Sequence, residues 1–245
     1  MKIMVINPNS SQHMTRHLDD VLQPIKDPGT ELYVCCPENG PLAIESAYDE
    51  GMCMPGVLKL VKQAEEEGYD AVILACFSDP GLDQAREIVD ILVCGIQEIA
   101  VHVAAMMGTK FSVLTLNRER VPSKYEDIYR YKLERALSSV HPIGLSVTEA
   151  DENPELTRRR IMETAQIAAE QFGAEVIVLG CAGMAGFSDE VQEKLGLVVI
   201  DPTSVALKVT EALVRTGLKP SKRGFYAYPP SFVREGRVKA AQVQI

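Results

Sequence analysis

Short apolar runs alternate along the chain with longer amphipathic stretches. The runs are rich in β-branched residues and lack the alternation of a half-exposed strand, which is typical of parallel strands buried on both faces. In chain order they cover residues 2–6, 32–36, 71–76, 92–96, 111–115, 143–147, 176–179 and 197–200. The stretches between them have helical periodicity. We therefore predict an α/β protein in which a helix follows each strand.

Several helix ends carry clear signals. Gly68 and Gly173 each follow an amphipathic stretch, in the position where a glycine commonly ends a helix. Asp79-Pro80 and Asn153-Pro154 each combine a capping residue with a first-turn proline, so we expect helices to begin there. The buried face of the helix before Gly173 is expected to carry Ile161, Ala165, Ala168 and Phe172.

The second half of the chain repeats the first. GYDAVILACFSDPGL from Gly68 aligns with GAEVIVLGCAGMAGF from Gly173 at an offset of 105 residues, which pairs Cys76 with Cys181. The same offset lays residues 92–96 over 197–201. The segment KIMVINPNS at 2–10 aligns with KFSVLTLNR at 110–118 at an offset of 108. A constant offset over equivalent elements indicates an internal duplication.

The duplication predicts two similar flavodoxin-like lobes, with parallel sheets related by a pseudo-two-fold axis and an active site in the cleft between them. We place the first lobe at residues 1–97 and the second at 98–202. The helix at 203–215 and the rest of the segment 203–245 have no counterpart in the repeat. We expect this segment to pack back on the first lobe.

The paired cysteines are the strongest candidates for chemistry. Cys76 and Cys181 each end a predicted strand, at the sheet edge where open parallel sheets bind ligands. Matched lobes facing each other would place one thiol on each side of a small molecule. Helix N-termini close to both thiols would lower their pKa. Such a pair can remove a proton from one face of a carbon and return one on the other, whereas the alternative interpretation is two buried packing residues.

Four segments together identify a family resemblance: VINPNS at the start, CFSDPGL after the third strand, GCAGMAG in the second lobe and VIDPTSVALK near residue 200. The chain resembles the aspartate/glutamate racemase superfamily and, within it, the hydantoin and allantoin racemases. The resemblance implies a cofactor-independent racemase with Cys76 and Cys181 as the acid/base pair. It also implies a homo-oligomer. The chain departs from hydantoin racemases at Ser78, where glycine is familiar.

Further residues are expected to contact the substrate. Asn9, Ser10 and Thr115 lie at the edges of the two equivalent first strands, although capping or turn roles are open alternatives. The turns that follow the cysteines are expected to direct backbone N–H groups at the oxygen that becomes negative when the carbon loses its proton. These turns comprise Phe77, Ser78, Asp79, Ala182, Gly183 and Met184. Asp79 is expected mainly to cap the helix that begins at Pro80.

Composition and charge exclude several classes of binding partner. The chain has 34 acidic and 25 basic residues and a net charge of −9, which disfavours nucleic acid and anionic membranes. The apolar run at the start is too short for a signal sequence and none approaches a membrane span, so we expect a cytoplasmic protein. The spacing of the four histidines fits no metal site, and GCAGMAG is not a dinucleotide fingerprint. We expect no metal and no cofactor.

Other features have less specific explanations. Cys35, Cys36, Cys53 and Cys94 are expected to be packing residues. The basic, aromatic tail at residues 219–239 suggests an oligomer contact more than a nucleic-acid site.

The expected activity is racemisation of 5-monosubstituted hydantoins or allantoin. Because no Arg or Lys adjoins either cysteine in sequence, we expect a cleft without charge. One alternative is an aspartate/glutamate-type amino-acid racemase, which would need cations for the carboxylates. Another alternative is a small-molecule binding module without catalysis.

Overall fold

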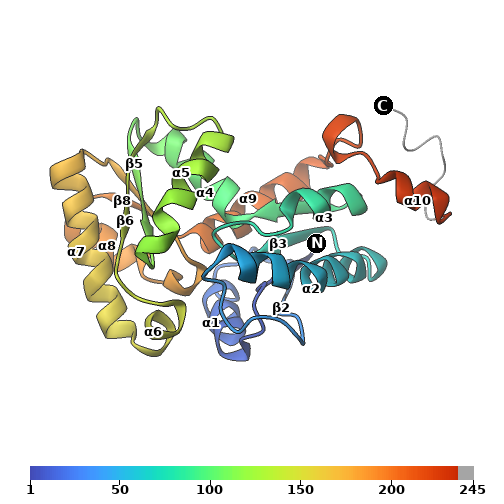
Figure 1. Cartoon of the computed structure of the whole chain (residues 1–245), viewed down its shortest axis with the longest axis horizontal. Helices are drawn as coiled ribbons and strands as arrows, with labels where there is room; N and C mark the ends of the chain where they lie inside the picture. Colours follow the sequence, from blue (N-terminus) through green and yellow to red (C-terminus); the bar gives the residue numbers. More distant parts are fainter. Residues whose placement is uncertain (237–245) are drawn as a thin grey trace.

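The computed structural model describes residues 1–236 and contains two four-stranded parallel sheets placed side by side (Figure 1). The first sheet has the order β2-β1-β3-β4 and the second has the order β6-β5-β7-β8. The strands are β1 (Lys2–Ile6), β2 (Glu31–Cys35), β3 (Ala71–Leu74), β4 (Leu92–Gly95), β5 (Phe111–Thr115), β6 (Leu137–Pro142), β7 (Val176–Leu179) and β8 (Val198–Ile200). The predicted α/β class with two lobes is confirmed.

Helices connect successive strands and cover the sheets. In the described part of the chain the α-helices are α1 (Gln12–Leu22), α2 (Ala47–Glu66), α3 (Leu82–Ile88), α4 (Ile96–Met107), α5 (Val121–Arg130), α6 (Val147–Glu152), α7 (Pro154–Phe172), α8 (Ser188–Leu195), α9 (Pro202–Thr216) and α10 (Pro230–Arg234). Three short 3₁₀ segments are η1 (Arg118–Arg120), η2 (Ala182–Met184) and η3 (Gly224–Tyr226).

Strand register reproduces the sequence repeat. In the first sheet Ile3 of β1 pairs with Ala71 of β3, and in the second sheet Phe111 of β5 pairs with Val176 of β7. These partners are related by the offsets of 108 and 105 found in the sequence. The carboxyl ends of β1 and β3 therefore correspond to those of β5 and β7.

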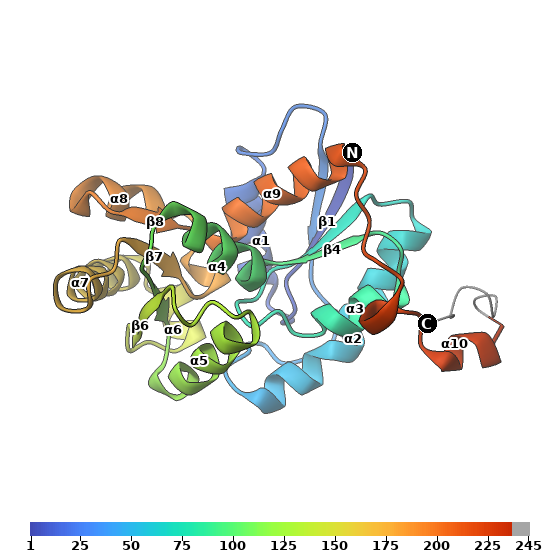
Figure 2. The ribbon, with the colours of Figure 1, turned by 90° about the horizontal axis from the view of Figure 1, so that it is seen from above.

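Two long helices are exchanged between the lobes. Helix α4 follows β4 of the first sheet, yet it packs against β7 and β8 of the second. Helix α9 follows β8 of the second sheet but packs against β3, β4 and α1 of the first. The two helices also pack against each other where the lobes meet (Figure 2). One continuous apolar core consequently extends through both lobes, from Ile3 and Val5 to Ala206 and Leu207.

The prediction of a strand at residues 143–147 is wrong. The strand in this part of the chain is instead β6, at one edge of the second sheet, which carries polar side chains and is less buried than β5 beside it. Ile143, Leu145 and Val147 are buried, but Gly144 between them has a φ of +77°. This left-handed residue is incompatible with an extended strand. The buried apolar residues that suggested a strand belong to a loop packed over the core and, at Val147, to the start of α6.

The helix expected before Gly173 has the predicted limits, but its buried face ends earlier. Ile161, Ala165 and Ala168 are fully buried, and Gly173 has the left-handed conformation expected after a helix. Phe172 is 48% exposed. It lies beside edge strand β6, where the ring packs on His141 with 4.6 Å between ring centroids.

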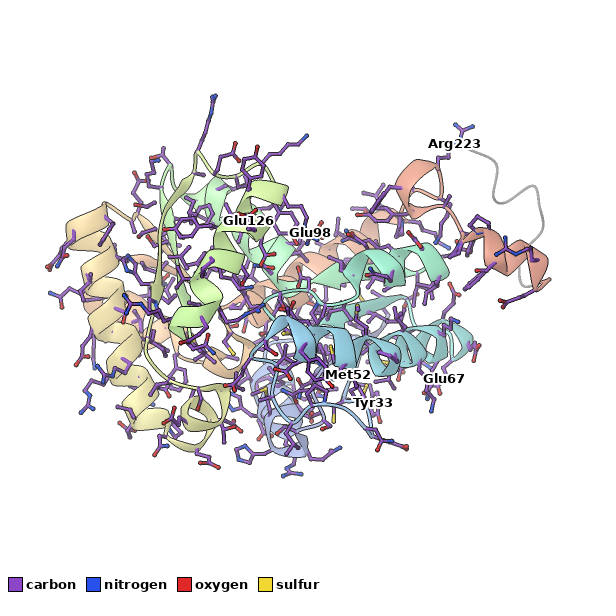
Figure 3. The ribbon with its side chains drawn as sticks, viewed as in Figure 1. Tyr33, Met52, Glu67, Glu98, Glu126 and Arg223 are labelled. Atoms are coloured by element: carbon purple, nitrogen blue, oxygen red, sulfur yellow. The ribbon has the colours of Figure 1, made fainter. Side chains whose placement is uncertain are left out.

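The segment after α9 folds partly onto helix α3. The hydroxyl of Tyr226 donates to a carboxylate of α3, and the ammonium of Lys222 lies 4.3 Å from the ring centroid of Tyr228. Arg223 projects from the segment into solvent (Figure 3). Arg237 lies outside the described residues. An oligomer contact through this segment stays a prediction.

Gly180 allows the close approach of two strands beneath the second cysteine. It follows β7, and its N–H donates to the carbonyl oxygen of Leu114 at 2.7 Å. A Cβ at residue 180 would lie 2.5 Å from that same oxygen. By contrast, a Cβ on Gly51 of helix α2 would meet nothing within 4 Å.

We predict opposite effects of alanine at these two glycines. Gly180→Ala should lower the free energy of unfolding by about 1–3 kcal/mol, because the backbone must move to admit the methyl group. Gly51→Ala should raise it by about 0.5–1 kcal/mol through helix propensity. Urea unfolding of both variants measures the difference. Equal stability of the two variants would contradict the close approach of β5 and β7.

Candidate active site

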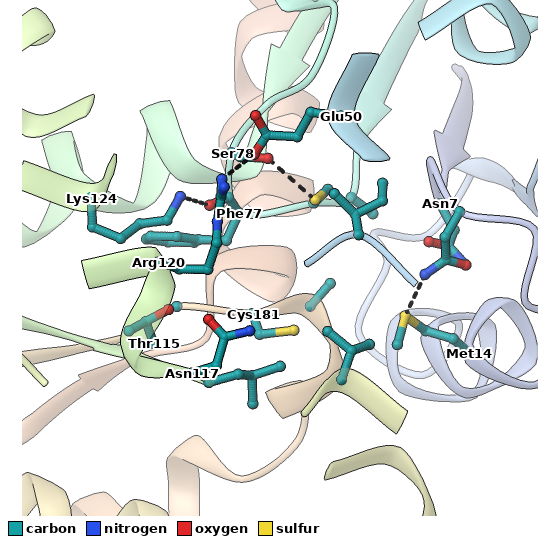
Figure 4. A pocket seen from close by; sticks show the side chains of 18 residues that line it. Asn7, Met14, Glu50, Phe77, Ser78, Thr115, Asn117, Arg120, Lys124 and Cys181 are labelled. Carbon is teal, nitrogen blue, oxygen red and sulfur yellow. Dashed lines mark hydrogen bonds and ion pairs between the residues drawn. The ribbon is translucent and has the colours of Figure 1, made fainter. Parts of the chain in front are cut away.

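A pocket lies between the lobes, where the carboxyl ends of the central strands of both sheets meet (Figure 4). It holds about 580 Å³ of empty space, including the open mouth. Residues following β1 and β3 line it from the first lobe, and residues following β5 and β7 line it from the second. The duplication therefore builds the two walls from equivalent positions.

Cys76 and Cys181 both line this pocket. Cys76 follows β3, and its Sγ is 3.6 Å from the hydroxyl of Ser78. Cys181 follows β7, and its Sγ accepts the backbone N–H of Gly183 at 3.3 Å. A negative charge on Cys76 would raise the pKa of Cys181. The structure brings the predicted pair into one site.

The expectation of thiols activated by helix N-termini is wrong. Helix α3 starts only at Leu82, and Cys181 precedes a single 3₁₀ turn. Burial raises the pKa of Cys76 to about 11 and that of Cys181 to about 12. The hydrogen bonds from Ser78 and Gly183 oppose this shift but are too weak to cancel it. Burial therefore disfavours the thiolate at both positions.

Two cations line the pocket, which corrects the expectation of a cleft without charge. Arg120 forms an ion pair with Glu50 of the opposite lobe. Lys124 is buried, donates to the carbonyl oxygen of Phe77 and lies 3.0 Å from a carboxylate oxygen of Asp127. Each cation thus has an anionic partner. No short-range sequence pattern identified them, because both come from the segment after β5, far from either cysteine.

Lys124 acts on both cysteines through its charge. It lowers the pKa of Cys76 and of Cys181, although in each case by less than burial raises it. The same ammonium also lies 5.4 Å from the ring centroid of Phe77. Lys124 therefore fixes the turn after Cys76 and favours thiolate on either side of the pocket.

The polar residues that follow β1 bond mainly to one another. Asn9 lines the pocket as expected, and its Oδ1 accepts from Nδ2 of Asn7 at 2.7 Å and from the N–H of Ser11 at 2.9 Å. Ser10 does not line the pocket. Its hydroxyl instead donates to the carbonyl oxygen of Gly40 at 3.0 Å and fixes the loop before α2.

Thr115 and Asn117 supply polar groups from the second lobe. Thr115 lines the pocket as expected. Asn117 also lines it, and the sequence repeat had paired this residue with Asn9 without indicating a role. Asn7 is a further lining residue that no motif identified.

The two turns after the cysteines use some of their N–H groups internally. The N–H of Asp79 donates to the carbonyl oxygen of Cys76 at 3.0 Å, and that of Met184 donates to Cys181 in the same way at 3.1 Å. Gly183 contacts Cys181 Sγ but does not line the pocket. Within residues 1–236, three N–H groups of pocket-lining turn residues have no hydrogen-bond partner, those of Phe77, Ser78 and Ala182.

Asp79 does not cap the helix that follows it, which corrects our expectation. That helix starts at Leu82 after Gly81, and Asp79 has a φ of +46°. Its buried carboxyl group accepts the N–H groups of Gln97 at 3.0 Å and Glu98 at 2.8 Å, so it caps α4. Burial raises its pKa to about 7. Asp79 lies behind the pocket wall and ties the turn after Cys76 to the exchanged helix.

The described residues contain no group of three or more His, Cys, Asp or Glu side chains placed to hold a metal ion. No helix among them is both long and apolar enough to cross a membrane.

The raised thiol pKa values predict slow alkylation at neutral pH. Because only thiolate reacts well, the rate of Cys76 modification by iodoacetamide should rise about tenfold per pH unit between pH 7 and 10. Peptide mass spectrometry over time gives the rate at each pH. The urea-unfolded protein is the control and should react faster at pH 8. A rate in the folded protein that levels off below pH 8 would contradict the effect of burial.

The sequence from residue 3 to 210 matches the family model described as Asp/Glu/Hydantoin racemase. The chain is 39% identical over 241 residues to a hydantoin racemase of Rhizobium meliloti, covering 98% of this chain and 97% of that protein. A hydantoin racemase of Pseudomonas sp. (strain NS671) is 38% identical over 94% of this chain and 92% of its own length.

Among solved structures, an allantoin racemase from Klebsiella pneumoniae superposes with a TM-score of 0.91 at 36% identity. The superposition covers 94% of each chain. The two-lobe fold is thus shared with this relative. The chain belongs to the Asp/Glu/hydantoin racemase family.

Proposed function

We propose that this protein racemises 5-monosubstituted hydantoins or allantoin, with Cys76 and Cys181 as alternate base and acid. The observation that carries the proposal is the presence of two thiols in one pocket, at equivalent strand ends of the two lobes. A ring lying between the lobes presents one face to each thiol. The relatives named hydantoin racemase and allantoin racemase support this substrate class.

Each turnover moves one proton off carbon 5 and returns another. The thiolate of one cysteine takes the proton from one face, and the electrons of that C–H bond pass to the adjacent carbonyl as an enolate. The thiol of the other cysteine then donates its proton to the opposite face. The enzyme is left with thiol and thiolate interchanged, so the same pair works in both directions. This transfer uses protein groups alone.

Backbone donors are available for the enolate oxygen. The unpaired N–H groups of Phe77, Ser78 and Ala182 lie in the turns beside the thiols. Fixed donors of this kind stabilise charge that develops during the reaction, because they need no reorientation. Lys124 adds a positive charge that favours both the thiolate and the enolate.

The raised pKa values of the two thiols predict an activity that depends on pH. Burial raises the pKa of Cys76 to about 11, so the thiol form is favoured over the thiolate at pH 7. Activity should therefore rise with pH through the neutral range. The raised thiol pKa also keeps the partner cysteine protonated, which the acid role requires.

The charges in the pocket favour a neutral substrate. Arg120 and Lys124 are the cations an amino-acid racemase would need, but they pair with Glu50 and Asp127. A substrate carboxylate would have to displace one of these partners or enter the site without a counterion. Either costs free energy that a neutral ring avoids.

We predict that Cys76→Ser and Cys181→Ser each abolish racemisation, by at least about 10³-fold, without loss of fold. Serine is nearly isosteric with cysteine but is a much weaker base at neutral pH. The assay follows optical rotation of a 5-alkyl hydantoin in heavy water together with deuterium at carbon 5. Each variant should at most exchange the carbon 5 proton of one enantiomer for deuterium, because the base on one face of the ring has been removed.

Cys94→Ser is a matched control, because Cys94 is a buried strand cysteine outside the pocket. The folded Cys94→Ser variant should racemise the substrate at the wild-type rate. Wild-type rates in both pocket variants would overturn the mechanism. Ligand binding by the wild-type protein without deuterium exchange would identify a binding module instead.

We further predict a strong preference for neutral rings. The kcat/KM for a 5-alkyl hydantoin or allantoin should exceed that for aspartate or glutamate by at least about 10²-fold, because the pocket cations are paired. Glu50→Gln removes the anionic partner of Arg120, which leaves this cation available to a substrate carboxylate. The kcat/KM for aspartate or glutamate should therefore rise relative to that for the hydantoin. Faster turnover of aspartate or glutamate by the wild-type protein would favour the amino-acid racemase alternative.

A further inference from the structure

One polar atom in the pocket is buried without a hydrogen-bond partner. The Oδ1 atom of Asn117 has almost no accessible surface and no hydrogen-bond partner among residues 1–236. Of the buried side-chain atoms that share this condition, it alone belongs to a residue lining the pocket. Figure 4 shows the Asn117 side chain on the same side of the pocket as Cys181. A buried acceptor left unpaired is destabilising, so its presence at a site points to a ligand.

The equivalent residue of the first lobe, Asn9, already has hydrogen-bond partners within the protein. Asn9 corresponds to Asn117 in the sequence repeat, but both polar atoms of its amide have partners within the protein. Its Nδ2 donates to Sδ of Met14 at 3.2 Å. The Nδ2 of Asn117 makes no hydrogen bond in the described part of the chain. The duplicated position therefore has a structural role in one lobe and is free in the other.

A structural role for Asn117 in its own lobe is also missing. The residue precedes η1, where an Asn side chain often accepts a backbone N–H, but it makes no such capping bond. Its neighbours Arg120 and Lys124 already pair with Glu50 and Asp127. Neither charge is directed to the amide.

We propose that the amide of Asn117 binds an edge of the hydantoin ring where an N–H stands beside a C=O. A carboxamide presents an acceptor and a donor side by side, and such an edge presents the complementary donor and acceptor. Oδ1 then accepts the ring N–H while Nδ2 donates to the carbonyl. This inference rests on the proposed function and makes Asn117 the residue that selects cyclic ureides over rings lacking the N–H.

The test uses 5,5-dimethylhydantoin, which has no proton on carbon 5 and therefore binds without turnover. Calorimetry should give a Kd about 10 to 100-fold higher for Asn117→Leu than for the wild type, because both ring groups lose their partners. The melting temperature of Asn117→Leu should stay equal or rise, since leucine removes an unpaired buried acceptor. A purely structural asparagine would instead lower the melting temperature and leave the Kd unchanged.

Two analogues identify the ring nitrogen. In 2,2-dimethylsuccinimide a CH₂ group replaces N1–H, and in 3,5,5-trimethylhydantoin a methyl group replaces the hydrogen on N3. For the analogue that lacks the N–H bound by Asn117, the Kd of Asn117→Leu should lie within about twofold of the wild-type Kd. Steric effects of the analogue cancel in this ratio because leucine and asparagine are similar in size.

The inference is overturned if Asn117→Leu binds 5,5-dimethylhydantoin as tightly as wild type, or if the wild-type advantage persists with both analogues. If leucine prevents folding, Asn117→Asp replaces it, keeping the shape while losing the donor, and the same loss of affinity is expected. If the wild-type protein racemises hydantoins and Asn117→Leu binds 5,5-dimethylhydantoin with an unchanged Kd, this inference is contradicted but the proposed function is not. A wild-type protein that neither binds nor racemises them overturns the proposed function as well.

Discussion

The packing of α4 against α9 is the interaction on which the site depends. Each helix covers the sheet of the lobe it does not follow, so the two sheets are fixed to each other through one shared core. Asp79 extends this constraint to the pocket, because its carboxyl group caps α4 while its backbone belongs to the turn after Cys76. The relative placement of two strand ends from different sheets is therefore set by buried packing. The positions of the two thiols that line the pocket are thereby fixed relative to each other.

Exclusion of water from the pocket has two opposing electrostatic effects. Loss of water strengthens hydrogen bonds and charge–charge interactions within the site, but it also disfavours a thiolate on either cysteine. Lys124 offsets part of that cost, and its own charge is balanced by Asp127. Burial outweighs this charge, so the pKa of both cysteines stays above the usual range of a thiol. Thiols of this kind also resist oxidation and alkylation, since the thiolate is the reactive form.

The sequence predicted those features that the duplication repeats. Strand ends, the glycines after helices and both cysteines occupy equivalent positions in the two halves, so an alignment of the chain with itself located them. Features that break the repeat were missed or misjudged. Edge strand β6 is too polar to resemble a buried strand, and Asp79 caps a helix 17 residues away along the chain.

The charged lining of the pocket was missed for a similar reason. Arg120 and Lys124 reach the site only because the segment after β5 crosses to the first lobe, where Arg120 meets Glu50 and Lys124 meets Phe77. Sequence adjacency to a cysteine carries no information about such contacts. The helix exchange has a further consequence during synthesis on the ribosome. The face of the first sheet that α9 covers stays open until residues 202–216 emerge, so the first lobe exposes apolar surface while most of the chain is being made.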